Sequence, residues 1–175
     1  RLVGSEMCIR DSSKPGSSVT VLGHTRWASV GVISEPNAHP VDCAEVETIN
    51  KRHISAVLNG DIDNHMDLSE LHQLKIAPEI TTDAKVIPTI LAREFDLESE
   101  QLQAFKNTVD MFEGSVAIAT HNSEQPHELM LALRGSGQSL YIGLADNSYI
   151  VASEPYGVVE AVSYTHLTLP TTTPV

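Results

Sequence analysis

Three short stretches contain residues that could bind an acidic group and stabilise a negative charge. GHTRWASVG (23–31) carries Arg26 and Trp27, SEPNAHP (34–40) carries His39, and LNGDIDN (58–64) carries Asn59 and Gly60. A guanidinium pairs with a carboxylate through two parallel hydrogen bonds, so Arg26 is a candidate ligand for the carboxylate of an amino acid. The carboxamide of Asn59 and the backbone N–H of Gly60 could donate to an oxyanion formed during acyl transfer.

Each of these features also has an ordinary structural explanation. Arg26 can lie on the surface, Trp27 can pack in the core, and an Asn-Gly pair is common in turns. His24 and His39 have no third ligand at a telling spacing, so the sequence favours structural, hydrogen-bonded histidines over a metal site. The stretch RGSGQ (134–138) lacks the Lys-Ser/Thr pair of a phosphate-binding loop and is expected to form a hairpin or a bend.

Hydrophobic periodicity predicts the elements that must position these residues. Short β-branched runs indicate strands at 19–22 and 54–58, and the polar stretch between them (35–50) is expected to form a loop. Apolar residues at helical spacing predict three helices, with apolar faces made by Leu68, Leu71 and Leu74, by Val86, Ile87, Ile90, Leu91 and Phe95, and by Leu102, Phe105, Val109 and Phe112. Pro88 should kink the second helix or confine it to its first turns, and Gly114 should cap the third.

After Gly114 the hydrophobic period changes to that of strands. Strands are predicted at 116–120, 129–133, 140–144 and 149–152, with turns at 122–126, 135–137 and 146–148. A block of strands joined by hairpin-length links, following a block of helices, indicates an α+β fold with antiparallel sheets.

Charge and cysteine content exclude several classes of protein. The 175 residues carry a formal net charge of −12, which argues against nucleic acid or an anionic membrane as a partner. No apolar run approaches the length of a membrane span. The two cysteines, Cys8 and Cys43, offer no disulfide framework, so a reducing cytoplasm is the expected setting.

Both ends of the chain resemble a translated oligonucleotide. Back-translated, residues 6–12 and 161–167 fit one sequencing-adapter sequence read on opposite strands. We therefore expect residues 1–12 and 161–175 to be adapter-derived tails, and residues 13–160 to be a partial natural domain.

The joint order of HTRWAS, NAHP, LNG and TTDAKVI resembles the glutaminase domain of class II glutamine amidotransferases. The similarity covers essentially all of residues 13–160. It implies the four-layer αββα sandwich of N-terminal nucleophile hydrolases, here incomplete. It is strongest to the branch that makes glucosamine 6-phosphate, in which a sugar-phosphate isomerase domain follows downstream and accepts the ammonia.

The resemblance assigns roles to individual residues. It implies that Arg26 binds the α-carboxylate of glutamine, that Asp83 binds its α-ammonium, and that Trp27 and Ser29 line the same pocket. It implies that Asn59 and Gly60 bind the oxyanion, and that His24 and His39 support the loop structurally. Without the family, Asp83 would be interpreted as a helix-start carboxylate favoured by the helix dipole.

The family attacks glutamine with a cysteine at the mature N-terminus, whose own α-amine serves as the base. That position would lie upstream of Ser13, and Cys43 cannot replace it because an internal residue has no free α-amine. The fragment alone is therefore expected to be inactive. Neither metal nor organic cofactor is implied, and the intact parent could be an oligomer.

Two histidines usual in the family are replaced by Val30 and Val41, while Ser29 keeps a hydroxyl at a threonine position. These departures leave the acceptor substrate open. Alternatives are another class II amidotransferase, such as amidophosphoribosyltransferase or asparagine synthetase, and a non-catalytic glutamine-sensing module. The motifs HTRW and NAHP argue against the two other enzymes.

Overall fold

Two antiparallel sheets form the framework of the residues that the structure, a computed structural model, describes: 19–25, 29–46, 52–98, 100–145, 148–161 and 167–168. The first sheet has the strand order β1-β2-β3-β4, formed by β1 (Val41–Asp42), β2 (Ile54–Ile62), β3 (Gly114–Asn122) and β4 (Leu129–Arg134). The second has the order β6-β5-β7, formed by β5 (Tyr141–Ala145), β6 (Ser148–Ala152) and β7 (Leu167–Thr168).

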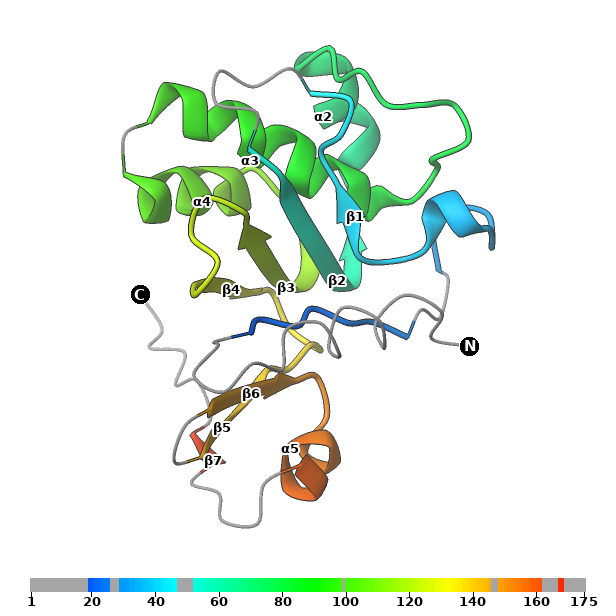
Figure 1. Ribbon diagram of the computed structural model, residues 1–175. Helices are drawn as coiled ribbons and strands as arrows, with labels where there is room; N and C mark the ends of the chain where they lie inside the picture. Colours follow the sequence, from blue (N-terminus) through cyan, green and yellow to red (C-terminus); the bar gives the residue numbers. More distant parts are fainter. Residues whose placement is uncertain are drawn as a thin grey trace.

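Helices cover the outer sides of both sheets (Figure 1). One side of the first sheet carries α2 (His65–Leu71), α3 (Val86–Leu97) and α4 (Gln101–Asp110). The second sheet lies on the other side, and α5 (Pro155–Ala161) packs against its strands β5 and β6. The predicted α+β class with antiparallel sheets is confirmed, and the layers follow the expected order of helix, sheet, sheet and helix.

Burial along β2 and β3 shows why the first sheet needs both layers. In β2, Ile54, Ala56 and Leu58 are buried at alternate positions, which is the pattern of a strand with one face on the helical core. The centre of β3 is buried at every residue from Val116 to Thr120, so both of its faces are covered.

The strands differ from the expected ones at three places. None of residues 19–25 forms a strand, and Val19 and Val21 are 49% and 57% exposed, because β-branched residues make a strand only where a neighbour accepts their backbone hydrogen bonds. The predicted strand 54–58 continues to Ile62. The predicted loop contains β1, which pairs Val41 with Ala56.

The helices occur where they were predicted, with local corrections. Leu71 and Leu102 are exposed rather than part of the apolar faces, at 76% and 66%. Leu74 and Phe112, predicted for the same faces, lie beyond the ends of α2 and α4. The helix α3 runs through Pro88 to Leu97, because in the first turn the missing N–H of proline has no intrahelical acceptor to lose. Gly114 is not a cap: α4 ends at Asp110, and Gly114 opens β3 with φ +111°.

The β-block after Gly114 matches the prediction strand by strand, and residues 135–137, directly after β4, form a bend rather than a hairpin. The bend leads from β4 in the first sheet to β5 in the second. Residues 1–12, and Asp146 and Asn147 of the last expected turn, lie outside the described residues. Within the expected C-terminal tail, Leu167 and Thr168 form β7 and pair with β5.

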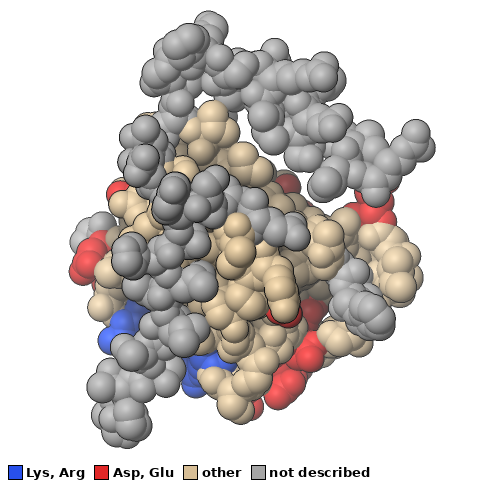
Figure 2. All heavy atoms as spheres, turned by 90° about the horizontal axis from the view of Figure 1, so that it is seen from below, with Lys and Arg blue, Asp and Glu red and all other residues tan. Residues whose placement is uncertain are grey.

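None of the helices in the described ranges is both long and apolar enough to cross a membrane. Figure 2 shows one face of the molecule, on which uncharged side chains occupy most of the described surface and acidic residues gather toward its margin.

Candidate active site

A pocket of about 250 Å³ lies where the loop before β1, the strand β2 and the start of the 3₁₀ turn η2 (Asp83–Lys85) meet. Every predicted site residue that the structure describes lines it: His24, Ser29, His39, Asn59, Gly60 and Asp83. Arg26 and Trp27 lie outside the described residues. Among these predicted residues, His24 and Asp83 are 59 positions apart in the chain.

Strand β2 supplies the floor of the pocket. Side chains alternate between the faces of a strand, so Asn59 and Asp61 project to the side opposite the buried Ala56 and Leu58. Asn59 and Gly60 were expected to follow the strand, but they lie inside it, paired with Ala117 and Val116 of β3. Pairing with a central strand holds the two candidate oxyanion donors in fixed positions.

Gly60 is required by its surroundings. Its φ is +110°, a region that residues with a Cβ rarely adopt. A Cβ built on Gly60 would overlap the carbonyl oxygen of Ser115 and lie 3.1 Å from Cγ of Gln138. The backbone of β2 therefore approaches β3 and the β4–β5 bend without a side chain between them.

Asp83 is a buried carboxylate, 4% exposed, at the edge of the pocket. Its Oδ2 accepts a hydrogen bond of 2.8 Å from the backbone N–H of Ile62. Burial raises the pKa of Asp83, and the hydrogen bond from Ile62 and the nearby His65 oppose that rise. A cationic ligand would favour the ionised form of this group.

The two histidines lie together beside Asp83. The rings of His24 and His39 are 4.6 Å apart between centroids, and His39 Nε2 lies 3.3 Å from Oγ1 of Thr82. The Thr82 hydroxyl donates to Oδ1 of Asp83 over 3.4 Å. With that hydroxyl donating, Nε2 of His39 acts as the donor to Thr82. The described residues contain no cluster of three or more His, Cys, Asp or Glu side chains that could hold a metal ion.

Ser29 and Asp61 join the loop to the floor. The hydroxyl of Ser29 donates a short hydrogen bond to Oδ1 of Asp61. Asp61 thereby contributes a second carboxylate to the pocket, next to Asp83. Among the described residues that line the pocket, those that can carry a positive charge are His24 and His39.

Sequence reasoning missed six residues that line the pocket: Thr25, Val30, Leu58, Asp61, Thr82 and Gln138. Asp61 and Thr82 could have been found, because each is adjacent to a predicted site residue. Gln138 carried no signal, since it reaches the pocket through the bend between the two sheets. Val41, at a position where the family usually has histidine, is a buried β1 residue that does not line the pocket.

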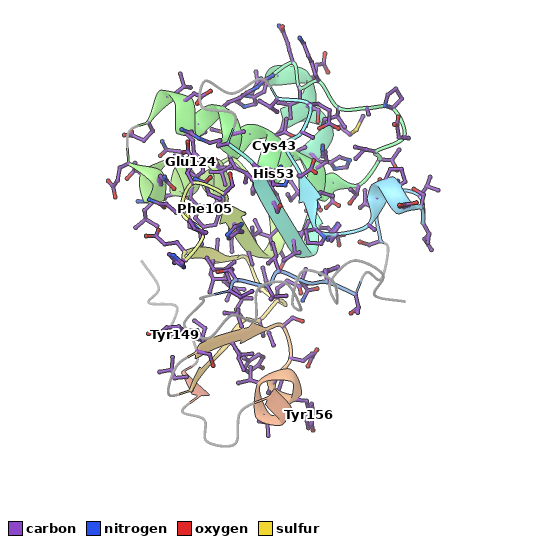
Figure 3. All side chains as sticks on the ribbon, in the orientation of Figure 1. Cys43, His53, Phe105, Glu124, Tyr149 and Tyr156 are labelled. Atoms are coloured by element: carbon purple, nitrogen blue, oxygen red, sulfur yellow. The ribbon has the colours of Figure 1, made fainter. Side chains whose placement is uncertain are left out.

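Cys43 is not placed to attack a ligand in this pocket. It is 2% exposed, and its Sγ accepts a hydrogen bond from the backbone N–H of Ile54. Burial raises the pKa of the Cys43 thiol, which disfavours the reactive thiolate. Figure 3 shows Cys43 in the helical half of the molecule, away from Tyr149 of the second sheet.

A family model described as a glutamine amidotransferase domain matches residues 45–160. The chain belongs to this family. The amidotransferase domain is 32% identical over 157 residues to the glutamine–fructose-6-phosphate aminotransferase (isomerizing) of Clostridium tetani, covering 88% of this chain and 24% of that protein. The protein of the same name from Neisseria meningitidis serogroup A is 32% identical over 163 residues, covering 91% and 25%. The domain thus spans about a quarter of the length of these relatives.

Solved structures share the fold of this amidotransferase domain. The glutamine phosphoribosylpyrophosphate amidotransferase of B. subtilis has a TM-score of 0.62 and 23% identity, covering 78% of this chain and 28% of that chain. A structure described as the allosteric regulatory enzyme of purine biosynthesis has a TM-score of 0.61 and 22% identity, covering 76% and 27%. These neighbours confirm the expected N-terminal nucleophile hydrolase type of fold.

Proposed function

We propose that this domain is the glutamine-hydrolysing half of a longer amidotransferase that aminates fructose 6-phosphate. The observation that carries the proposal is the shared pocket of Asn59, Gly60 and Asp83, which combines two neutral hydrogen-bond donors with a buried carboxylate. Glutamine carries an α-ammonium that can pair with the carboxylate, and a carboxamide whose oxygen becomes the oxyanion during acyl transfer. It therefore fits both features of the pocket.

In the intact parent, a cysteine thiolate upstream of residue 13 attacks the side-chain carboxamide of glutamine. The oxygen of the tetrahedral intermediate accepts hydrogen bonds from Asn59 and from the N–H of Gly60. Collapse of the intermediate breaks the C–N bond, and the leaving nitrogen takes the proton that the α-amine of the cysteine removed from the thiol and departs as ammonia. Water then hydrolyses the thioester and releases glutamate, while Arg26 and Asp83 hold the two charged groups of the substrate.

The acceptor half lies outside this chain. We place a sugar-phosphate isomerase domain downstream, and a longer parent fits relatives of which about three quarters of the length lies outside the matched part. Residues 13–160 form the natural part of the domain in this proposal, and the parent is cytoplasmic, which fits a chain without a disulfide framework.

Sequencing the gene beyond both ends of this chain tests the proposal. We expect the reading frame upstream of Ser13 to begin with Met-Cys-Gly, and the frame downstream of Glu160 to continue into sugar-phosphate isomerase domains. An initiator methionine without a following cysteine would contradict the catalytic function. A stop codon soon after Glu160 would contradict the proposed acceptor domain downstream.

Asp83→Asn is expected to weaken glutamine binding at least about tenfold, since a hydrogen bond between charged groups contributes about 1.5–3 kcal/mol. The raised pKa of Asp83 sets the sign of the pH dependence. Glutamine affinity should rise as the pH increases through that pKa, because binding of the ammonium requires the carboxylate. Folding stability contributed by Asp83 should fall over the same range, because the folded state holds the proton more tightly than the unfolded state.

Isothermal titration with L-glutamine from pH 4 to pH 8, with urea unfolding at each pH, measures both effects. Asp83→Asn, which can still accept from Ile62, should remove both pH dependences. Asp110→Asn is the matched control, since Asp110 is an exposed carboxylate that pairs with Arg134 at 3.6 Å outside the pocket. Unchanged affinity in Asp83→Asn would remove Asp83 from the ammonium site.

A further inference from the structure

Asn37 is a buried carboxamide that joins two segments of the chain. It is 0% exposed and ends the short 3₁₀ turn η1 (Glu35–Asn37). Its Oδ1 accepts hydrogen bonds from the backbone N–H groups of Thr81 and Thr82, at 2.6 Å and 2.8 Å. Its Nδ2 donates to Oγ of Ser34 at 2.8 Å and to the carbonyl of Glu79 at 3.0 Å. Both ends of the carboxamide are therefore fully used.

The two segments are adjoining walls of the pocket. The loop wall, residues 29–40, carries Ser29 and His39, whereas the turn wall, residues 79–83, carries Thr82 and Asp83. Asn37 itself does not line the pocket. It binds the backbone of the two residues that immediately precede Asp83 in the chain, so any shift of Asn37 is transmitted to that carboxylate.

Thr81 makes a second connection between the same walls. Its Oγ1 accepts a hydrogen bond of 3.0 Å from the backbone N–H of Val32. Gly31 has φ +82°, and a Cβ there would lie 2.8 Å from the backbone of Thr81. The two walls are thus in direct contact beside Asn37, and this contact holds them at a fixed distance from each other.

We propose that Asn37 is a positioning residue that sets the place of Asp83 relative to the loop wall, and thereby the affinity and selectivity for ligands with an α-ammonium. The inference rests on the proposed function, since it concerns glutamine in the same pocket. A ligand with charged groups at a fixed spacing is sensitive to the spacing of the groups that bind it. In enzymes, a misplacement of aligned groups by about 1 Å can lower the rate on the order of 10²-fold.

The test compares two ligands in the full 175-residue chain by isothermal titration. L-Glutamine can use Asp83, whereas glutaramate lacks the α-ammonium and cannot. Asn37→Ala is expected to raise the Kd for L-glutamine about tenfold and the Kd for glutaramate by much less, so the selectivity ratio falls. Thr81→Val removes only the contacts of the Thr81 hydroxyl, with the N–H of Val32 and with Oδ1 of Asn37, and should lower the ratio by a smaller factor.

Asn122→Ala is the matched control for loss of a buried carboxamide. Asn122 is 2% exposed, donates to Gln101 at 3.1 Å and accepts from the N–H of Glu124 at 3.1 Å, outside the pocket. It should lower Tm as Asn37→Ala does, yet leave the selectivity ratio unchanged. Amide hydrogen exchange should accelerate at Thr81 and Thr82 in Asn37→Ala alone.

The outcomes separate the two ideas. If the unsubstituted chain binds no L-glutamine, the proposed function fails and the inference fails with it. If the unsubstituted chain binds L-glutamine and the selectivity ratio is unchanged in folded Asn37→Ala, the inference alone is overturned. Should Asn37→Ala not fold, the ratio in Thr81→Val decides, and an unchanged value there overturns the inference.

Discussion

Gly60→Ala is expected to destabilise the domain by on the order of 4 kcal/mol, combining about 1–3 kcal/mol for a positive φ with about 1–3 kcal/mol for overpacking. The added Cβ would overlap the carbonyl oxygen of Ser115, which belongs to the paired strand and cannot move independently. Such a loss is a large share of the stability of an ordinary domain. Urea unfolding followed by circular dichroism measures it.

Gly137→Ala separates the two causes of that loss. Gly137 has φ +102°, but the nearest atom to a Cβ there is Oγ of Ser115 at 3.9 Å, which is ordinary contact. This variant should therefore show the cost of the dihedral angle alone. Equal destabilisation by Gly60→Ala and Gly137→Ala would mean that the approach of β2 to Ser115 is not as close as described.

Asn59→Ala in the intact parent should lower the glutamine-dependent kcat by on the order of 10²-fold or more, as loss of one oxyanion donor does elsewhere. The carboxamide of Asn59 is used chiefly when the oxyanion forms, so KM should change little. Arg26→Ala should do the opposite and mainly raise KM, because the α-carboxylate is bound in both the ground state and the transition state.

Ammonia provides the internal control for these two variants. Free ammonia bypasses the glutaminase pocket, so ammonia-dependent amination should survive both changes if the acceptor domain can use it. Steady-state kinetics with glutamine and with ammonium chloride distinguish the cases. A glutamine-dependent kcat untouched by Asn59→Ala would exclude Asn59 from the oxyanion hole.

Local signals predicted the fold well where one segment decides its own structure. The helix over Val86 to Phe95 and the strands after Gly114 follow from periodicity, because each has a continuous apolar face. The prediction of a strand at 19–22 was wrong, and β2 was predicted too short, for the same reason. Pairing decides both, and residues such as Asn59 and Gly60, which favour turns alone, remain in β2 because β3 pairs with them.

The sequence predicted which residues belong to the candidate site, but it did not predict how they are arranged. The motif residues His24, Asn59 and Asp83 were predicted together from the family resemblance of their motifs, and they line one pocket. Gln138 and Asn37 could not be assigned in this way. The first reaches the site through a bend between two sheets, and the second acts through backbone contacts with Thr81 and Thr82.

The backbone contact at Gly60 divides the pocket into parts with different capacity for evolutionary change. No side chain can be added at the floor, where Gly60 meets Ser115, and Gly114 and Gly135 are held by similarly close neighbours. New ligand preferences can instead arise where lining residues already carry side chains, for example at the exposed Ser29 of the loop wall. Descendants of this domain would keep the same chemistry on the carboxamide while diverging in which amino acid they admit.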